Sequence, residues 1–182
     1  MKSSRQAMIL ITGIMASGKS TVAQLLAERL DRSVHLRGDM FRKMIVNDRR
    51  EVRPDADEAE LEQLSLRYRL AAQAADAYFA AGFNVVVQDV VIGRMLEDFV
   101  SYVQTRPLYV VVLCPNPSVV AQREAGRAKK GYGEWTVEGL NEVLLGETPR
   151  IGMWLDTSSM TAEQTVDEIM KSVWDHGDVD VS

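Results

Sequence analysis

Short apolar runs alternate along the chain with longer segments that place apolar residues at helical spacing. The runs that predict buried strands cover residues 8–12, 34–37, 83–91, 109–114 and 153–155. The segments that predict helices cover residues 21–30, 40–46, 57–81, 94–104, 116–127, 136–145 and 161–174. Continuous apolar runs suit a parallel sheet that is covered on both faces. We therefore expect an α/β fold, a three-layer sandwich around a five-stranded parallel sheet with right-handed crossovers.

The longest predicted helix, residues 57–81, carries one clear apolar stripe. Its members recur at steps of three and four residues: Leu61, Leu64, Tyr68, Ala71, Ala75 and Tyr78. Pro54-Asp55 is the predicted start signal and Gly82 the stop signal. Leu66 and Leu70 lie off the stripe and predict a second apolar face, either core or the lining of a pocket.

The first predicted strand runs directly into Gly13-Ile14-Met15-Ala16-Ser17-Gly18-Lys19-Ser20, which fits the phosphate-binding pattern G-x-x-x-x-G-K-[ST]. Gly13 and Gly18 let the backbone turn tightly near phosphate oxygens, and the next helix directs its N–H groups at the anion. Lys19 is expected to reach the β- and γ-phosphates, and Ser20 to place its hydroxyl on Mg²⁺. A strand, a glycine loop and a helix in this order are the context that the motif requires, which disfavours a chance glycine turn.

The composition indicates one globular domain and disfavours several classes of protein. The 182 residues are 46% hydrophobic, with a net charge of −5, one cysteine and two histidines. A chain of this size folds without a disulfide or metal, and so few cysteines and histidines make a zinc site implausible. The negative charge disfavours long nucleic acids as partners. No apolar run approaches the roughly 20 residues of a membrane span, so we expect a cytoplasmic protein with no membrane partner.

Polar residues follow the predicted strands at the ends that share one edge of the sheet. After the phosphate loop come Asp39, Asp89, the pair Arg123 and Arg127, and the segment Asp156-Thr157-Ser158. Ligands of such sheets bind at the carboxyl ends of the strands, so these side chains are expected to converge. A phosphate loop, two carboxylates and two arginines at one edge indicate phosphoryl transfer.

The two carboxylates have different predicted roles. Asp39 is the candidate base, which accepts the proton of an attacking hydroxyl and holds that hydroxyl in line with the γ-phosphate. It also fits the N-cap of the following helix, and the two roles are compatible. Asp89 follows its strand as an acid that holds Mg²⁺ directly or through water, with contact to the acceptor and a structural role as alternatives.

The arginines form two groups. Arg123 and Arg127 are four residues apart beside a short glycine-containing segment, so a closing lid would bring them onto ATP; a solvated basic face is the alternative. Arg42 and the cluster that contains Arg53 are candidates for gripping an anionic acceptor, or they are simply solvated. The chain has no Asn-Lys-x-Asp guanine-reading motif, and Val90 rather than a water-activating glutamate follows Asp89. Both observations disfavour a switch GTPase or a motor ATPase.

With these motifs in place, the chain resembles the small P-loop kinases related to nucleoside monophosphate kinases, and within them the chloramphenicol phosphotransferase-like and gluconate-kinase-like branch. The resemblance covers residues 8 to about 173 and rests on G-I-M-A-S-G-K-S-T, R-G-D-M-F, Q-D-V-V-I-G, R-E-A-G-R and D-T-S-S-M-T-A-E-Q. It implies one kinase domain over residues 1–182, with strand order 2-3-1-4-5. It also implies a short lid at about 123–139 and an acceptor-binding region at about 40–70, and residues 176–182 are predicted to be a flexible acidic tail.

The resemblance implies roles for individual residues. The ones that bind ATP would be Gly13, Ala16, Ser17, Gly18, Lys19, Ser20, Thr21, Arg123, Thr157 and Ser158. Catalysis would rest on Asp39, Lys19, Arg123 and Arg127, and Mg²⁺ on Ser20 and Asp89. The candidate acceptor contacts are Arg42, Arg53 and Asp89.

The predicted function is transfer of the γ-phosphoryl group from ATP, with Mg²⁺, to a hydroxyl of a small molecule. An antibiotic or other natural product, a nucleoside and a sugar acid are the acceptor classes, and the enzyme is expected to be a monomer or homodimer. One alternative is a nucleotide or polynucleotide-end kinase. Another is a nucleotide sensor with little turnover.

Overall fold

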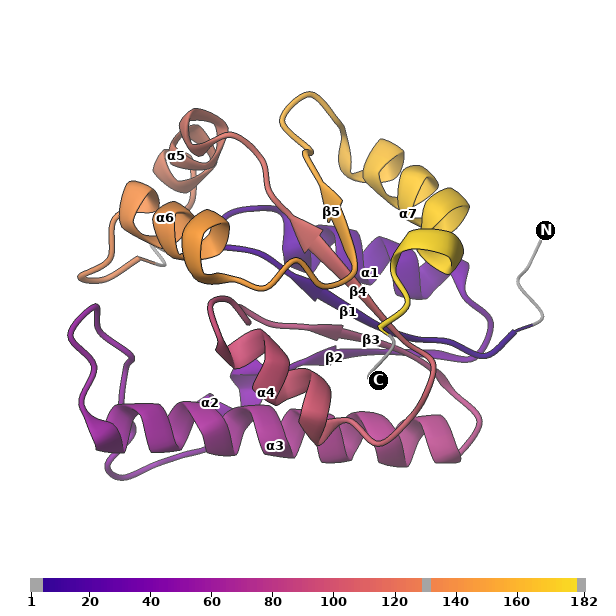
Figure 1. Ribbon diagram of the computed structural model, residues 1–182, viewed down its shortest axis with the longest axis horizontal. Coiled ribbons are helices and arrows are strands. Elements are labelled where there is room, and N and C mark those ends of the chain that lie inside the picture. Colours follow the sequence, from indigo (N-terminus) through magenta and orange to yellow (C-terminus); the bar gives the residue numbers. More distant parts are fainter. Residues whose placement is uncertain (1–4, 129–131, 180–182) are drawn as a thin grey trace.

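The protein is built around a five-stranded parallel sheet, shown in Figure 1. The computed structural model describes residues 5–128 and 132–179. The strands lie in the order β2 (Ser33–Arg37), β3 (Asn84–Gln88), β1 (Met8–Thr12), β4 (Leu108–Leu113) and β5 (Met153–Leu155). Every pair of neighbours is parallel, as between Leu10 and Val87 or between Leu10 and Val110. The predicted sandwich and its strand order 2-3-1-4-5 are confirmed.

Helices cover both faces of the sheet. One face carries α1 (Lys19–Arg29) and α7 (Ala162–His176), which pack on alternate residues of the central strands such as Ile9 and Val111. The other face carries α3 (Glu58–Ala80), α4 (Met95–Tyr102), α5 (Pro117–Ala125) and α6 (Val137–Glu147). The short α2 (Asp39–Lys43) begins where β2 ends and packs beside α3. The central strands are apolar on both sides because both faces are buried.

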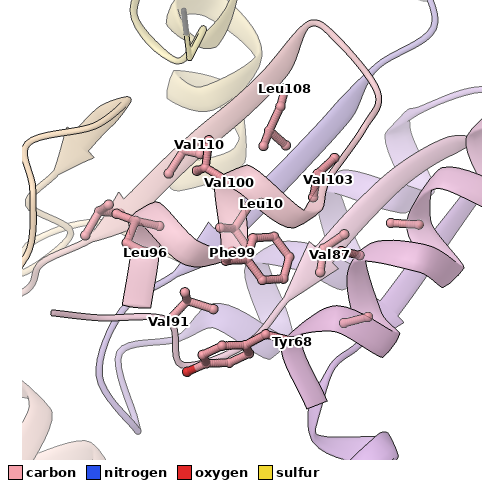
Figure 2. Packing of buried hydrophobic residues seen from close by; sticks show 14 of the residues in the cluster. Leu10, Tyr68, Val87, Val91, Leu96, Phe99, Val100, Val103, Leu108 and Val110 are labelled. Atoms are coloured by element: carbon pink, nitrogen blue, oxygen red, sulfur yellow. The ribbon is translucent and has the colours of Figure 1, made fainter. Parts of the chain in front are cut away.

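The larger of the two cores lies between the sheet, α3 and α4 (Figure 2). Phe99 of α4 and Tyr68 of α3 meet edge to face, with ring centroids 5.9 Å apart. The Tyr68 hydroxyl donates a 2.6 Å hydrogen bond to the Val90 carbonyl oxygen. This contact fixes the chain just after β3, where the candidate acid Asp89 lies.

Helix α3 begins later than its predicted start signal at Pro54-Asp55. Asp57 is the N-cap: its side chain accepts a hydrogen bond from the Glu60 backbone N–H, and the Glu60 side chain accepts one from the Asp57 N–H. This reciprocal capping box satisfies two backbone donors at the start of the helix. The central members of the predicted stripe are buried, whereas Leu61 and Tyr78 near its two ends are exposed.

The helix predicted over 116–127 ends earlier than expected. Helix α5 ends at Ala125 with Gly126 as its C-cap, so Arg127 lies beyond the helix that carries Arg123.

The start of the predicted tail is paired with β4. The Gly177 carbonyl accepts a hydrogen bond from the Val110 N–H, and the Val179 N–H donates one to the Leu108 carbonyl. Residues 177–179 thus lie antiparallel to the start of β4 through one isolated bridge, and residues 180–182 lie outside the described residues. In the part of the chain described, no helix has the length and apolarity needed to cross a membrane.

Candidate active site

The phosphate-binding loop joins β1 to α1 and is shaped by two glycines. A Cβ built on Gly13 would lie 2.6 Å from the Leu113 carbonyl oxygen and 2.8 Å from the Ser17 Oγ, so only glycine fits. Gly18, the N-cap of α1, has φ 97°, a left-handed conformation that other residues rarely adopt. Within the described chain no side chain caps α1, which leaves its first N–H groups available to an anion. The loop therefore has the geometry of a phosphate site.

A cleft of about 340 Å³ opens beside the loop. It is lined by Ser17, Gly18, Thr21, Val22, Arg123, Thr157, Met160, Thr161, Ala162 and Thr165. The Ser17 Oγ and the Thr157 Oγ1 are buried, and neither has a hydrogen-bond partner among the described residues. Buried hydroxyls without partners are rare, so these two atoms mark a place where a polar ligand fits.

Several predicted nucleotide contacts lie at this cleft. Arg123 reaches over the loop, and its Nη1 donates a 3.2 Å hydrogen bond to the Ser17 carbonyl oxygen. Thr21 and Thr157 are part of the lining. Ser158 is not among the lining residues: its Oγ accepts a 2.7 Å hydrogen bond from the Asn116 N–H and so ties the loop after β5 to the start of α5. This structural contact explains the position of Ser158, and no contact with a nucleotide is needed to explain it.

Lys19 is buried within the loop. Its Nζ donates a 2.6 Å hydrogen bond to the Ile14 carbonyl oxygen. Burial lowers the pKa of Lys19 to about 7, which the nearby Asp89 opposes and the charges of Arg127 and Arg67 reinforce. Arg127 thus acts on the phosphate loop although it lies outside α5, and it also pairs with Glu124 at 3.0 Å.

Asp39 opens α2 beyond the end of β2 and is surrounded by three cations. Its Oδ1 accepts a 2.9 Å hydrogen bond from the Arg42 Nε and lies 3.5 Å from the Arg67 Nη1, while its Oδ2 lies 3.1 Å from the Lys43 Nζ. Partial burial acts to raise the pKa of Asp39, but the bonds from Arg42 and Lys43 and the charge of Arg67 outweigh it and lower the pKa. Asp39 is therefore an ionised carboxylate at neutral pH, as a base must be.

Asp89 follows β3 and is bound by Arg67 of α3, a residue that the sequence did not point to. The Arg67 Nε donates a 2.9 Å hydrogen bond to Asp89 Oδ2, and its Nη2 donates to Oδ1. The Val90 N–H adds a 2.8 Å bond to Oδ1. The Asp89 side chain is 1% exposed and that of Arg67 13% exposed, so this is a buried bidentate ion pair. Burial acts to lower the pKa of Arg67, but Asp89 outweighs it and raises the pKa.

Gly38 allows β2 to approach this pair. A Cβ at Gly38 would lie 2.1 Å from the Asp89 Oδ2. The Gly38 N–H also donates a 3.0 Å hydrogen bond to the Gln88 carbonyl oxygen, which keeps β2 and β3 side by side up to the site. The glycine in R-G-D-M-F thus places Asp39 and Asp89 on the same edge of the sheet.

The predicted acceptor contacts Arg42 and Arg53 are both engaged in ion pairs. Arg42 links Asp39 to Glu51, so it stands at the site. Arg53 makes a bidentate pair with Glu60 at 2.9 and 3.0 Å, which lowers the pKa of Glu60 to about 2. Arg53 therefore anchors the loop before α3, and its guanidinium faces a carboxylate of its own chain.

The segment before α6 contacts both sides of the site. The Tyr132 hydroxyl donates a 2.6 Å hydrogen bond to the Met15 carbonyl oxygen in the phosphate loop. The Trp135 Nε1 donates a 2.9 Å bond to the Val52 carbonyl oxygen in the loop before α3. These two aromatic residues, which sequence reasoning missed, lie in the predicted lid at 123–139, of which residues 129–131 fall outside the described ranges. The one sign of them in the sequence was the presence of aromatic residues in a short glycine-containing segment.

The residues fit a magnesium ion that arrives with a nucleotide. Ser20 lies exposed in the first turn of α1, directly after Lys19. The described residues contain no group of three or more His, Cys, Asp or Glu side chains that could hold a metal by themselves. Mg²⁺ in kinases takes one or two protein oxygens and completes its shell with phosphates and water, and the Ser20 hydroxyl would be such a protein oxygen.

Comparison with known proteins agrees with this geometry. No curated protein matches the sequence. Among solved structures, the fold is similar to an unliganded sugar kinase from Janibacter sp., with 16% identity over 92% of this chain and 94% of that chain and a TM-score of 0.67. The tunicamycin resistance protein of Deinococcus radiodurans is 20% identical over 97% and 99% of the two chains, with a TM-score of 0.66. The Mycobacterium tuberculosis APS kinase in complex with AMPPNP and APS is 17% identical over 93% and 98%, also with a TM-score of 0.66.

These likenesses show a shared P-loop kinase fold. The sequence itself matches a protein family over residues 6–174, which include the phosphate loop, Asp39, Asp89 and Arg123. The chain belongs to the chloramphenicol phosphotransferase-like protein family.

Proposed function

We propose that the protein transfers the γ-phosphoryl group of ATP, in the presence of Mg²⁺, to a hydroxyl group of a small molecule. The observation that carries the proposal is the placement of Asp39 opposite the phosphate loop. Lys19 belongs to the loop, Asp89 lies close enough to oppose the lowering of the Lys19 pKa by burial, and Arg67 joins Asp89 to Asp39. A base and a phosphate site at one sheet edge are the parts that phosphoryl transfer needs.

Each residue has a role that follows from its position. The ionised Asp39 accepts the proton of the acceptor hydroxyl and directs its oxygen at the γ-phosphate. Lys19 and the N–H groups at the start of α1 hold the phosphates, and Arg123 and Arg127 offset the charge of the group in transfer. The cleft beside Thr157 receives the adenine and ribose. Mg²⁺, held by the Ser20 hydroxyl and the phosphates, would neutralise charge on the β- and γ-phosphates.

The pairing of charges around Asp39 favours an uncharged acceptor. Arg42 is neutralised by Asp39 and Glu51, Arg67 by Asp89, and Lys43 by Asp39. An anionic acceptor would be held best by a cation whose charge is not already balanced, and these three each have a carboxylate partner. Among the candidate classes, an alcohol-bearing natural product or a nucleoside therefore fits better than a sugar acid.

A screen of acceptors tests the proposal. The protein is incubated with MgATP and one candidate acceptor at a time, and phosphorylated products are detected by mass spectrometry. Two pairs of acceptors differ in charge, thymidine with thymidine monophosphate and glucitol with gluconate, and chloramphenicol is tested as a natural product. We expect ATP loss to equal product formed, with the uncharged member of each pair preferred. Nucleotide binding with neither ATP loss nor product from any alcohol would contradict the proposal and favour a nucleotide sensor.

A further inference from the structure

The two carboxylates at the active site share one arginine. Arg67 uses its Nε and Nη2 on Asp89, which leaves Nη1 facing Asp39 at 3.5 Å. All three residues lie in regular elements or directly beside one: Asp39 opens α2, Arg67 lies near the middle of α3, and Asp89 directly follows β3. Arg67 is therefore fixed from one side by a buried carboxylate and contacts the candidate base from the other.

This arrangement makes the two oxygens of Asp39 unequal. A carboxylate oxygen has two lone pairs. Oδ1 has two cationic neighbours, the Arg42 Nε, which donates a hydrogen bond at 2.9 Å, and the Arg67 Nη1 at 3.5 Å. Oδ2 has one cationic neighbour, the half-exposed Lys43 at 3.1 Å. Oδ2 is thus the less crowded oxygen and the better placed of the two to accept a proton.

The same contacts occupy Asp89. Each of its oxygens accepts from Arg67, and Oδ1 also accepts from the Val90 N–H. The side chain is buried, with Gly38 against it. A direct bond from Asp89 to a metal ion would have to displace the Arg67 guanidinium. The Ser20 side chain, by contrast, is exposed and could bind the ion.

We propose that Arg67 is a positioning residue for Asp39, and that Asp89 serves to hold Arg67 rather than to bind Mg²⁺. Arg67 orients the Asp39 carboxylate so that Oδ2 faces the acceptor hydroxyl. When the O–H bond of the acceptor breaks, its proton passes to Oδ2 and its oxygen forms the new bond to phosphorus as ADP leaves. This inference rests on the proposed kinase function.

The test compares Arg67→Gln, Asp89→Asn and the double variant Arg67→Gln/Asp89→Asn with a control, Arg69→Gln. Arg69 is exposed two positions along α3 and makes no ion pair with any described residue. Each single variant leaves one buried charge without its partner and is expected to lower the melting temperature. The double variant replaces the ion pair by two amides that can bond to each other, so its melting temperature should recover towards that of the wild type.

Kinetics on the best acceptor of the screen separate positioning from folding. For Arg67→Gln we expect kcat to fall about 10- to 100-fold, the scale of losing an orienting group, with the KM for MgATP within about two-fold. The double variant should regain stability without regaining kcat, whereas Arg67→Lys should recover part of kcat. Recovery of kcat together with stability in the double variant would reduce Arg67 to a structural residue and overturn the proposal.

Two binding measurements need no acceptor. The Mg²⁺ concentration that gives half-maximal binding of a fluorescent ATP analogue should change less than about two-fold in Asp89→Asn. Loss of a direct magnesium ligand would raise this concentration much more. An increase of ten-fold or more would make Asp89 a metal ligand and would contradict the proposal.

The pKa of the Asp39 carboxyl group, followed by ¹³C NMR, should be higher in the double variant than in Asp89→Asn, because only the double variant lacks the Arg67 charge. An equal value would contradict the contact between Arg67 and Asp39. If the wild type phosphorylates no alcohol, the proposed function fails, while the NMR titration still tests the Arg67–Asp39 contact.

Discussion

The Trp135 indole N–H donates a 2.9 Å hydrogen bond to the Val52 carbonyl oxygen, which joins the segment before α6 to the loop before α3. Three residues earlier, Tyr132 bonds to Met15 in the phosphate loop. The short segment 132–135 therefore connects the nucleotide side of the site to the side where α2 and α3 present Asp39 and Arg67. We propose that this segment acts as a lid, and that its two contacts couple closure over the nucleotide to the position of the loop before α3.

Replacement of Trp135 by Phe removes this hydrogen bond and keeps an aromatic ring. A neutral hydrogen bond contributes about 0.5–1.5 kcal/mol, so we expect the acceptor KM to rise about 2- to 10-fold with little change in the KM for MgATP. Steady-state kinetics provide the measurement. Trp174→Phe is the matched control, because the Trp174 indole N–H also donates to a backbone carbonyl, that of Met170 in α7. Equal acceptor KM values for the two variants would show that the Trp135–Val52 hydrogen bond does not affect binding of the acceptor.

Residue 38 must be a glycine because Asp89 lies too close to leave room for a side chain. A Cβ there would lie 2.1 Å from the Asp89 Oδ2, so Gly38→Ala must push the buried Arg67–Asp89 pair apart. Overpacking of this kind costs about 1–3 kcal/mol in the free energy of unfolding, which urea denaturation measures. Gly146→Ala in α6 is the control, since its Cβ would meet nothing within 4 Å and alanine favours a helix. Equal stability of the two variants would mean that the pair tolerates displacement.

Thr157→Val separates stability from ligand binding. The Thr157 Oγ1 is buried without a partner among the described residues, and a buried unsatisfied hydroxyl costs about 1–3 kcal/mol. Valine has nearly the same shape, so we expect the melting temperature of the free protein to stay the same or rise. ATP-analogue affinity, measured by calorimetry, should fall roughly 3- to 10-fold as one hydrogen bond to the ligand is lost. Unchanged affinity would place the nucleotide elsewhere.

The Arg53–Glu60 pair predicts how stability depends on pH. Arg53 lowers the pKa of Glu60 from 4.5 to about 2. Because the folded pKa lies below the unfolded one, the ionised Glu60 stabilises the protein above about pH 4.5, and this contribution is lost as the pH falls towards 2. Glu60→Gln should therefore be less stable than the wild type at pH 7, and the difference in melting temperature should shrink steadily below pH 4.5. A difference independent of pH would exclude the ion pair as its cause.

Sequence patterns were sufficient for the parts of the molecule that depend on local spacing. The central strands are continuous apolar runs because both faces are buried, and the phosphate loop is specified by Gly13, Gly18 and Lys19 in fixed register. Asp39 could be singled out because it directly follows a strand that had to end at the ligand-binding edge.

The residues that sequence reasoning missed depend on how distant segments meet. Arg67 precedes Tyr68 of the buried stripe, but only the path of α3 past the ends of β2 and β3 brings its guanidinium to Asp39 and Asp89. Tyr132 and Trp135 act through backbone carbonyls, which have no sequence signature. The acidic residues on both sides of Val179 likewise gave no sign that this segment pairs with β4.

The central claim is that Asp39 is the base for phosphoryl transfer to an alcohol, and Asp39→Asn tests it most directly. The amide keeps the size of the side chain and cannot accept the proton, so kcat on the best acceptor should fall about 10²- to 10⁴-fold. The KM for MgATP should stay within about two-fold, and Asp175→Asn, an exposed change on α7, should leave kcat unchanged. An Asp39→Asn variant that phosphorylates the acceptor at the rate of the wild type would contradict the account.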